Sequence, residues 1–451
     1  MSKLERPPGS FREVARGALA NERMQDVLDV ATANLRQVRL GAWEKLDDVE
    51  ALREQGREAR TRAIKNLPGY LDEFQRNVEA RGGHVHRCAT DTEACDKIID
   101  ICRAVDAKLV AKSKSMASEE IGLNGALEAE GVTVVETDLG EYILQLAGEH
   151  PVHIVAPAIE KTAEDVAQLL ESVDGEPVER ELRALTAKAR RQLREVFLTA
   201  DVGVTGANFA IAETGSICIV TNEGNGRLVS SLPRVHVVIL GMERLVANTQ
   251  DLAVCLKLLA RSATAQPLTV YTTVLTGPRR AGEEDGPEQL HVIVLDNGRS
   301  SLLGTRYEEM LNCIRCGACL NVCPIYRKAG GAAYGPVYSG PMGAVLVPLL
   351  ATAPDLPHAS SLCGACTQAC PVKIPLHELL LELRRDLVDD RVAPWWERAA
   401  FTLWSIAWSN QLGYRATTTL ARLGQPLGPL FARRWSRGRT LPRLQRRYRD
   451  R

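Results

Sequence analysis

The chain has 451 residues, 45% hydrophobic and 25% charged, which is enough for two or three domains that each bury a core. Its 56 lysines and arginines balance its 56 aspartates and glutamates, so the composition gives no reason to expect a nucleic-acid partner. The amino terminus is too polar for a secretory signal, and no stretch approaches the ~20 apolar residues of a spanning helix, so we expect a cytoplasmic protein without a transmembrane segment.

Residues 1–66 form the first expected segment. From Asn21 to Asn66 the sequence is charged, with apolar residues at roughly helical spacing. This pattern predicts helices that pack on the domain that follows.

Residues 67–303 are predicted to form an α/β domain. Short β-branched runs at 107–113, 132–137 and 152–158 indicate buried strands, and helical patterns at 118–130 and 162–172 lie between and after them. Later runs at 209–222, 235–240 and 290–296 follow one another without long helices, which favours antiparallel pairing. We therefore expect a mixed sheet covered by helices.

One candidate ligand loop lies in this domain. Lys112 and Lys114 end a predicted strand just before a helix, where open α/β sheets usually bind ligands, although solvated loop lysines explain them equally well. Glu213 lies beside hydroxyl residues at a hairpin turn, and turn formation alone accounts for it. The sequence has no G-x-G-x-x-G dinucleotide fingerprint, and its other glycine-rich stretches are typical of turns.

His84, His86 and Cys88 alternate on one face of a short predicted strand and could hold a metal, but structural histidines are the favoured interpretation. Other cysteines occur in apolar or helical contexts and are predicted only to pack, namely Cys95, Cys102, Cys218 and Cys255.

Residues 304–390 contain the strongest signal in the chain. Cys313, Cys316, Cys319 and Cys323 precede Pro324 in the pattern C-x2-C-x2-C-x3-C-P, in which the fourth cysteine ligates the other of two iron-sulfur clusters. A second run repeats this pattern with Cys363, Cys366, Cys370 and Pro371, and has Ser360 in the first position.

Exchange of the fourth cysteines predicts two ligand sets. Cys313, Cys316, Cys319 and Cys370 would hold one [4Fe-4S] cluster, and Cys323, Cys363 and Cys366 would hold the other. The missing ligand could come from Ser360, Ser361, water or a partner, and a three-iron cluster is an alternative at that site. Zinc is disfavoured because its closed sites take four ligands from two C-x2-C pairs.

Residues 391–451 form a carboxyl-terminal extension rich in tryptophan and arginine. Trp395, Trp396, Trp404 and Trp408 precede nine arginines between Arg433 and Arg451. A tail that docks on a partner or is disordered is favoured over peripheral membrane contact.

With these motifs in view, the chain resembles the lactate utilization protein B family over most of residues 70 to 390. The resemblance is carried by KSKSMASEEIGLN from Lys112, TGANFAIAETGSICIVTNEGNGRL from Thr205, LNCIRCGACLNVCPIY from Leu311 and LCGACTQACPVKIPLHELL from Leu362. It implies a lactate-utilisation α/β domain, like those of sugar-phosphate isomerases and CoA transferases, joined to a helical two-cluster ferredoxin domain. It also implies that all seven cysteines are ligands and that Ser360 is a trait of the family.

The implied function is that of an iron-sulfur electron-transfer subunit in a bacterial system that converts L-lactate to pyruvate without NAD. The implied partners are a cysteine-rich subunit and a small subunit that shares the α/β domain, and the sequence does not identify the electron acceptor. Two alternatives remain: a redox-sensing or scaffold module, or the same electron carrier serving another 2-hydroxy acid such as glycolate or a thiol-disulfide couple.

Overall fold

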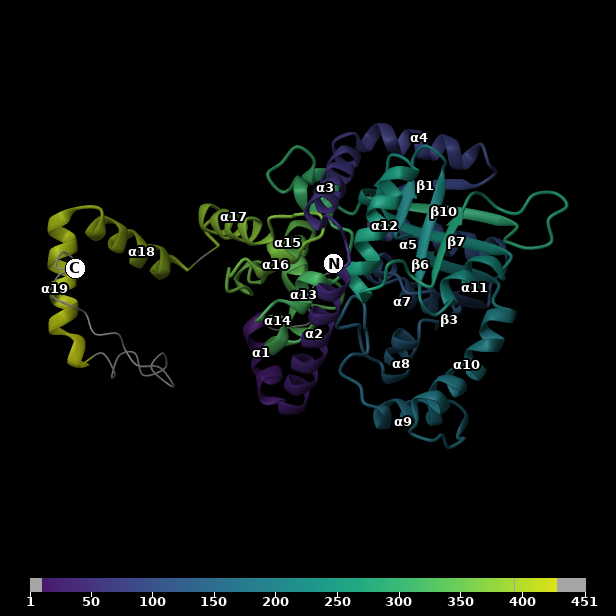
Figure 1. Ribbon diagram of the computed structural model, residues 1–451, viewed down its shortest axis with the longest axis horizontal. Helices are drawn as coiled ribbons and strands as arrows, with labels where there is room; N and C mark the ends of the chain where they lie inside the picture. The colour runs from purple at the N-terminus through teal and green to yellow at the C-terminus, as the bar shows by residue number, and fades with distance from the viewer. Residues whose placement is uncertain (1–9, 393, 428–451) are drawn as a thin grey trace. The chain divides into compact units, whose positions relative to one another are not determined.

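The computed structural model describes residues 10–392 and 394–427. The chain divides into two compact units, Met1–Leu383 and Arg384–Arg451. Every strand within the described residues belongs to the first unit (Figure 1).

The larger sheet of the first unit consists of six parallel strands in the order β1-β10-β7-β4-β2-β3. From β2 the chain moves outward to β3 and then returns to β4, from which β7 and β10 extend the sheet in the opposite direction. Strand order therefore reverses between β2 and β4. The strands are β1 (His84–Cys88), β2 (Leu109–Lys112), β3 (Thr133–Glu136), β4 (Val202–Gly206), β7 (Val235–Gly241) and β10 (Gln289–Leu295).

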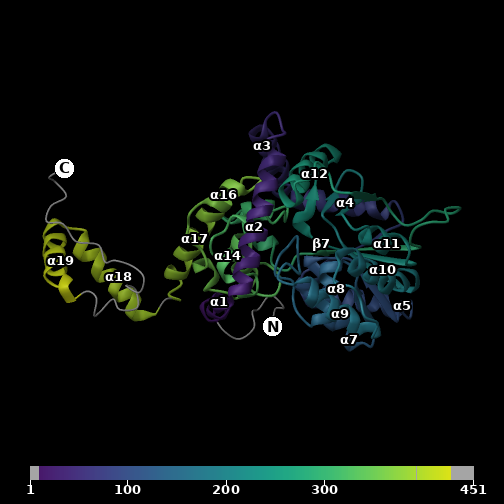
Figure 2. The same cartoon turned by 60° about the horizontal axis from the view of Figure 1, so that its bottom comes forward.

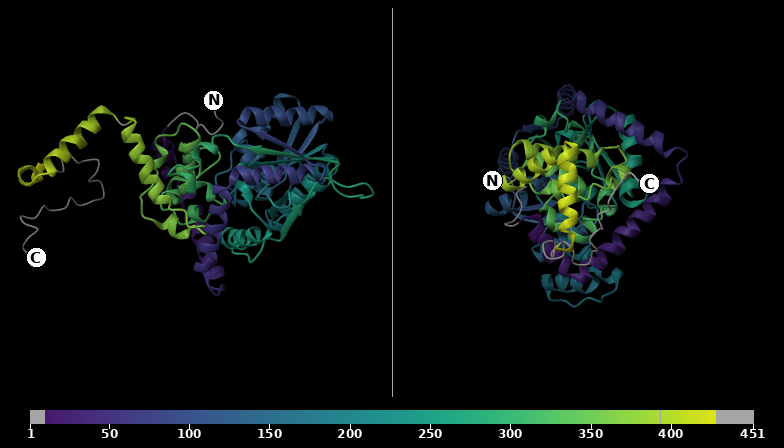
Figure 3. Two further views of the ribbon diagram at one scale, coloured as in Figure 1. Left: turned by 90° about the horizontal axis from the view of Figure 1, so that it is seen from above. Right: turned by 90° about the vertical axis from the view of Figure 1, so that its left-hand side faces the viewer.

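Helices cover both faces of this sheet (Figure 3). Alternate residues of β7 face different cores, because successive side chains of a strand point to opposite faces. Val235 and Val237 pack among residues of α5, α6 and α7, whereas Val238 and Leu240 pack against α4 and the smaller sheet. These helices are α4 (Leu67–Glu79), α5 (Asp91–Ala104), α6 (Met116–Ile121) and α7 (Leu123–Ala129).

The smaller sheet is mixed and has the order β8-β5-β6-β9. The antiparallel pairing predicted for residues 209–222 is confirmed in β5 and β6, but it is wrong for 235–240 and 290–296, which pair in parallel as β7 and β10. A 16-residue helix, α12, lies between these two strands and provides the crossover that parallel pairing requires. The strands are β5 (Phe209–Ile211), β6 (Ser216–Thr221), β8 (Leu245–Val246) and β9 (Tyr271–Leu275).

The strand predicted at 152–158 is absent, and this segment forms turns instead. The His153 imidazole accepts hydrogen bonds from the backbone N–H groups of Val155 and Ala156, each at 3.1 Å. The Val152 carbonyl accepts from the Tyr326 hydroxyl at 2.9 Å. Side chains thus form hydrogen bonds with backbone groups that would have paired with a neighbouring strand in a sheet.

The remaining helices of the α/β region agree in part with the predicted patterns. The helix predicted at 162–172 is confirmed as α9, which Thr162 caps. The helix predicted at 118–130 is broken at Gly122, whose φ of +63° ends α6. These helices are α8 (Leu139–Ala147), α9 (Ala163–Asp174), α10 (Leu182–Thr199), α11 (Asn225–Ser231) and α12 (Thr249–Thr264).

The amino-terminal helices α1 (Phe11–Ala20), α2 (Glu22–Trp43) and α3 (Val49–Lys65) confirm the helical prediction for this region. Helix α2 contacts both the cysteine-bearing segment, at α13 and α14, and helix α12 (Figure 2). The fully buried Leu28 belongs to a core that contains residues of both the cysteine-bearing segment and α12. These helices therefore fasten that segment to the α/β domain.

The cysteine-bearing segment is built from short helices around a core that it shares with α12 and the smaller sheet. They are η3 (Glu308–Asn312), α13 (Ala318–Asn321), α14 (Tyr326–Ala329), η4 (Ala332–Tyr334), α15 (Gly340–Leu350), η5 (Leu356–His358), α16 (Ala365–Ala369) and α17 (Leu376–Asp389). A further short helix, η2 (Ser300–Leu302), precedes them, and η1 (Met242–Arg244) follows β7.

The second unit contains α18 (Trp395–Trp408), α19 (Gln411–Leu423) and η6 (Gln425–Leu427). Neither α18 nor α19 has a buried residue, and Trp395 and Trp396 are 75% and 60% exposed. The nine arginines of the tail, for which partner docking or disorder is predicted, lie outside the described residues. Among the helices that are described, none combines the length and apolar character needed to cross a membrane.

Candidate functional site

Four cysteines from both halves of the tandem motif line one small cavity. Cys313, Cys316 and Cys319 come from the loop before α13 and from α13 itself, and Cys370 comes from the end of α16. The rest of the lining is almost wholly apolar and includes Ile154, Ile314, Met342, Val372, Ile374 and Leu376. Four thiols around a dry cavity suit the four iron corners of a [4Fe-4S] cluster.

Backbone amides point at the sulfur atoms of these cysteines. The N–H of Arg315 donates to Sγ of Cys313 at 3.4 Å, and the N–H of Ile374 donates to Sγ of Cys370 at 3.3 Å. Left-handed backbone at Arg315 and Gly317, with φ of +58° and +74°, turns the loop so that its amides converge. Such N–H···S bonds stabilise the negative charge of ligating thiolates.

The other three cysteines gather at a second, adjacent site. Burial, together with the charges of Cys323 and Cys363, raises the pKa of Cys366 to about 11, so the three thiols are neighbours. The charges of Cys366 and Cys370 both raise the pKa of Cys319, which places the two cysteine groups side by side. Helices α13 and α16 pack together at this boundary.

Ser360 occupies the same place in the second loop that Cys313 occupies in the first. Its Oγ accepts the N–H of Leu362 at 3.1 Å, as Sγ of Cys313 accepts the N–H two residues later. Leu362 and Gly364 have φ of +55° and +79°, close to the angles at the matching positions of the first loop. The hydroxyl of Ser360 therefore lies where a fourth thiolate would be expected.

Arginines from the amino-terminal helices hold the loops that carry these cysteines. Nη2 of Arg39 donates to the Ala369 carbonyl at 2.7 Å, and Nη2 of Arg53 donates to the Cys370 carbonyl at 2.8 Å. The fully buried Arg60 donates to the carbonyls of Leu245 at 2.6 Å, of Leu311 at 3.1 Å, and of Glu243 and Asn312. Helices α2 and α3 thus supply both mechanical support and positive charge beside a cluster that is anionic with four thiolates.

The thiols differ in accessibility. Burial raises the pKa of Cys316 to about 11 and that of Cys370 to about 12. A hydrogen bond from the Ala365 backbone lowers the pKa of the exposed Cys363. Loading of metal on the buried thiols must therefore release their protons, since only thiolates ligate iron.

A larger cavity of about 270 Å³ lies at the carboxyl ends of β2, β4 and β7. This is the point where strand order reverses, and open α/β sheets bind ligands at such a point. Arg315 and Ile154 line both this cavity and the cysteine cavity. We call it the switch-point cavity.

A network of buried charges forms part of its wall. Arg299 makes two hydrogen bonds to Glu120, at 2.7 and 2.8 Å, and lies 2.7 Å from Glu243. Nη2 of Arg315 lies 3.3 Å from Glu243, and its guanidinium stacks over the Tyr338 ring at 4.6 Å. The side chain of Arg244 lies beside them.

The candidate ligand-loop residues are separated by the fold. Lys112 is fully buried and forms ion pairs with Glu119 and Glu136, both at 2.6 Å. Lys114 lines the switch-point cavity and donates to the Val155 carbonyl at 3.2 Å. Glu213 is exposed at the β5–β6 turn and does not line that cavity.

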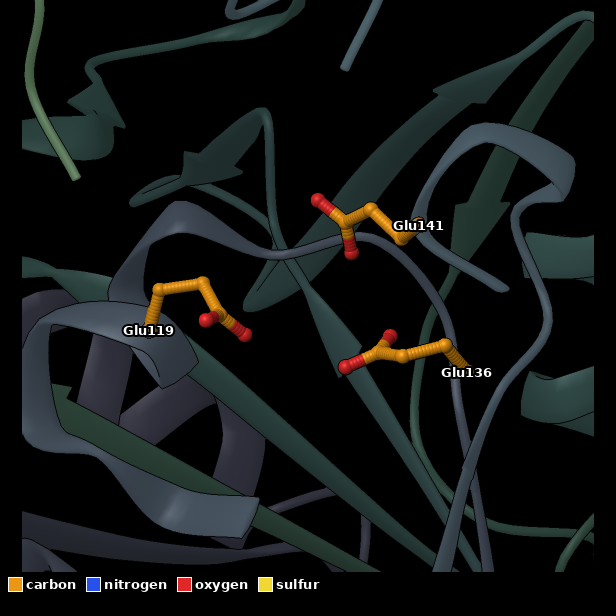
Figure 4. Close-up of side chains that lie close together, drawn as sticks. All are labelled: Glu119, Glu136 and Glu141. Atoms are coloured by element: carbon orange, nitrogen blue, oxygen red, sulfur yellow. The ribbon is translucent and has the colours of Figure 1, made fainter. Parts of the chain in front are cut away.

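Around Lys112, the carboxylates of Glu119, Glu136 and Glu141 point toward one another (Figure 4). Burial raises the pKa of Glu141, and the neighbouring charge of Glu136 adds to the shift. Since the ammonium of Lys112 already lies among the carboxylates, we interpret this cluster as a structural ion network.

His84, His86 and His291 form a stack on the adjacent strands β1 and β10, with 3.2 Å between Nε2 of His86 and Nδ1 of His291. The cysteines outside the tandem motif are all buried, as expected for residues that pack in the core, namely Cys88, Cys95, Cys102, Cys218 and Cys255.

Sequence reasoning missed the arginines of the switch-point cavity. Two signals could have found them: Arg315 lies inside the first cysteine motif, and Glu243-Arg244 follows the buried strand at 235–240 after two intervening residues. The carboxyl end of such a strand is a favoured place for binding residues.

Comparison with known proteins agrees with this arrangement. Residues 71–295 match the LUD domain, and residues 309–374 match the 4Fe-4S dicluster domain. The dicluster match and the cysteine sites together show that the chain binds two [4Fe-4S] clusters.

Whole-chain relatives are also found. The chain is 48% identical over 412 residues to lactate utilization protein B of Bacillus velezensis, covering 90% of this chain and 86% of that protein. It is 45% identical over 459 residues to lactate utilization protein B of Anoxybacillus flavithermus, covering 98% and 97%. Among solved structures, a DUF162 family protein from Deinococcus radiodurans aligns with a TM-score of 0.28 at 14% identity, over 51% of this chain and 98% of that one.

Proposed function

Because this chain belongs to the lactate utilization protein B family and takes part in lactate utilization with iron-sulfur electron transfer, we propose that it is the electron-transfer subunit of a multi-component system that oxidises L-lactate to pyruvate. The observation that carries the proposal is the pair of adjacent cysteine sites, one of which shares a wall with the switch-point cavity. A chain of this kind would be the redox component of an L-lactate dehydrogenase-type complex that does not use NAD.

We assign Cys313, Cys316, Cys319 and Cys370 to the first cluster and Cys323, Cys363 and Cys366 to the second. The shared cavity of the first four cysteines supports the first set, and the mutual proximity of the other three supports the second. Ser360 or an exchangeable ligand would complete the second site, because its hydroxyl takes the place of the first cysteine of the repeat.

When bound, the two clusters supply one-electron transfer at close range. The residues of the chain set the conditions for it. Ile154, Met342 and Leu376 exclude water from the first site. Arg39 and Arg53 hold the backbone on either side of Cys370, and the amides of Arg315 and Ile374 balance the charge of the ligating sulfur atoms.

The proposed partners are the cysteine-rich subunit and the small α/β subunit of the same system. The exposed tryptophans of α18 offer large amphipathic side chains of the kind that recur at protein interfaces. A cytoplasmic location is part of the proposal, since seven cysteines at metal-ligand spacing fit best in a reducing compartment.

Growth on lactate tests this function in the cell. We expect deletion of the gene to abolish growth on L-lactate while leaving growth on pyruvate intact. Complementation with Cys370→Ser should fail, and complementation with Cys218→Ser should succeed, because Cys218 lies in strand β6 and is not in a cluster motif. Normal growth of the deletion strain on lactate would refute the proposal, provided that no second lactate oxidation system is present.

A further inference from the structure

The arginine side of the switch-point cavity contains a positive charge that the neighbouring carboxylates do not neutralise. Three guanidinium groups, those of Arg244, Arg299 and Arg315, share two carboxylates, those of Glu120 and Glu243. Glu120 is fully occupied by Arg299, the Asn297 amide and the Tyr338 hydroxyl. One cation of the network therefore lacks a carboxylate of its own.

That cation is Arg244. Within the described part of the chain its guanidinium makes one long hydrogen bond, from Nη1 to the Cys313 carbonyl at 3.5 Å, and its nearest carboxylate, that of Glu243, is 3.8 Å away. Its side chain retains 14% exposure, so a ligand in the cavity can reach it. Arginine side chains stay protonated at neutral pH, so this group carries a positive charge.

The other accessible cation, Lys114, is already close to carboxylates. Glu223 and Asp138 line the same cavity, and the charge of Lys114 acts on Glu223. An anion would therefore be drawn to the Arg244 side. Apolar side chains of α12 and β6, including Leu259, Ala263 and Val220, also line the cavity and offer contact to an alkyl group.

We propose that the switch-point cavity is a binding site for a small organic carboxylate, namely the 2-hydroxy acid or its 2-oxo product, with the carboxylate held by Arg244 next to the first cluster. The substrate class rests on the proposed function, whereas the anion site rests on the geometry of the cavity. Arg244 bridges the two, because it contacts the loop of Cys313 on one side and lines the cavity on the other. The subunit that carries the clusters would then also bind the substrate.

Binding to the isolated, cluster-loaded chain tests this proposal. Anaerobic calorimetry with pyruvate and with L-lactate should show binding, and propane-1,2-diol, which lacks the carboxylate, should not bind. Arg244→Gln should weaken binding tenfold or more, which is the expected effect of losing a charge-assisted hydrogen bond. The electron paramagnetic resonance spectrum of the dithionite-reduced first cluster should change on addition of pyruvate in the wild type and not in this variant.

Arg39→Gln is the matched control. Arg39 is also a mostly buried arginine whose charge acts on the cysteines of the first site, but it donates to Ala369 and stacks on Trp43, away from the cavity. It should change the reduction potential of the cluster without changing pyruvate affinity. If both variants shift the potential and neither alters binding, Arg244 serves only the charge of the cluster and the proposal is wrong.

A second variant tests the proposal independently in case Arg244→Gln does not fold. Ala263→Leu fills the cavity from α12 without touching the charge network and should also lose pyruvate binding while retaining full iron content. Absence of binding in the wild-type chain would overturn the carboxylate site but not the electron-transfer function. Failure of lactate to reduce the clusters in the complete complex would overturn that function even if pyruvate binds.

Discussion

Arg60 offers the sharpest test of how the cluster loops are held. It is fully buried, and its guanidinium donates to four backbone carbonyls, two after β7 and two at the end of η3. Arg60→Leu keeps much of the volume of the side chain but leaves these carbonyls without their donor. The α/β domain and the first cysteine loop would lose their common anchor.

The expected magnitude follows from two opposing effects. Hydrogen bonds to a charged donor contribute ~1.5–3 kcal/mol each, so four could contribute far more than any single substitution usually removes. Against this, burial of the Arg60 charge costs desolvation free energy, as its lowered pKa indicates, and the leucine variant no longer bears that cost. We therefore expect a net loss of about 3–5 kcal/mol, as for other broken buried networks.

Urea unfolding of the cluster-loaded protein measures this loss. The visible absorption of the clusters and the far-ultraviolet circular dichroism should be followed together, because a chain of several domains need not unfold in one step. In Arg60→Leu the cluster signal should disappear at a much lower urea concentration than in the wild type. Arg57→Leu, on the same helix but exposed and paired with Glu54, should have little effect. Equal midpoints for the two variants would refute the anchoring role.

Three further outcomes are expected. Ser360→Cys should add a fourth thiolate to the second site, so the three-iron paramagnetic resonance signal should develop more slowly in air; an unchanged rate would place the hydroxyl outside the site. In metal-free protein, iodoacetamide should label Cys363 before Cys370. Cys363 is exposed and has a lowered pKa, whereas burial raises the pKa of Cys370 to about 12. Peptide mass spectrometry measures the order, and simultaneous labelling of the two cysteines would contradict the prediction. Burial lowers the pKa of His236 to about 3, from ~6.5 in the unfolded chain. As the pH falls, the imidazole is therefore protonated in the unfolded chain before it is protonated in the folded chain. The stability of the fold should decrease as the pH drops from 6.5 toward 3. Between pH 6.5 and 5 the loss amounts to about 1.6 kcal/mol. His236→Gln should lose this part of the pH dependence in chemical denaturation, and equal slopes for variant and wild type would count against it.

The sequence predicted most reliably what depends on local spacing. The cysteine motifs specify their loops through residues only two or three apart, and the structure brings Cys313, Cys316, Cys319 and Cys370 around one cavity. The strands at 107–113 and 132–137 were also predictable, because an unbroken β-branched run is typical of a buried parallel strand.

Features that depend on distant partners could not be predicted in the same way. Residues 152–158 have the composition of a strand, but His153 and Tyr326 satisfy its backbone instead, and Tyr326 lies 174 residues from Val152. The anion site at Arg244 forms only because the end of β7 meets the loop of Cys313. Arg244 and Cys313 are 69 residues apart in the sequence, and no local pattern indicates that they are in contact.

The most direct test of the central claim combines metal analysis with spectroscopy. Anaerobically purified protein should contain about eight irons and eight acid-labile sulfides per chain, as two [4Fe-4S] clusters require. With the two partner subunits present, addition of L-lactate should produce the paramagnetic resonance signals of reduced clusters. Full clusters that stay oxidised with lactate and all partners present would contradict the proposed function.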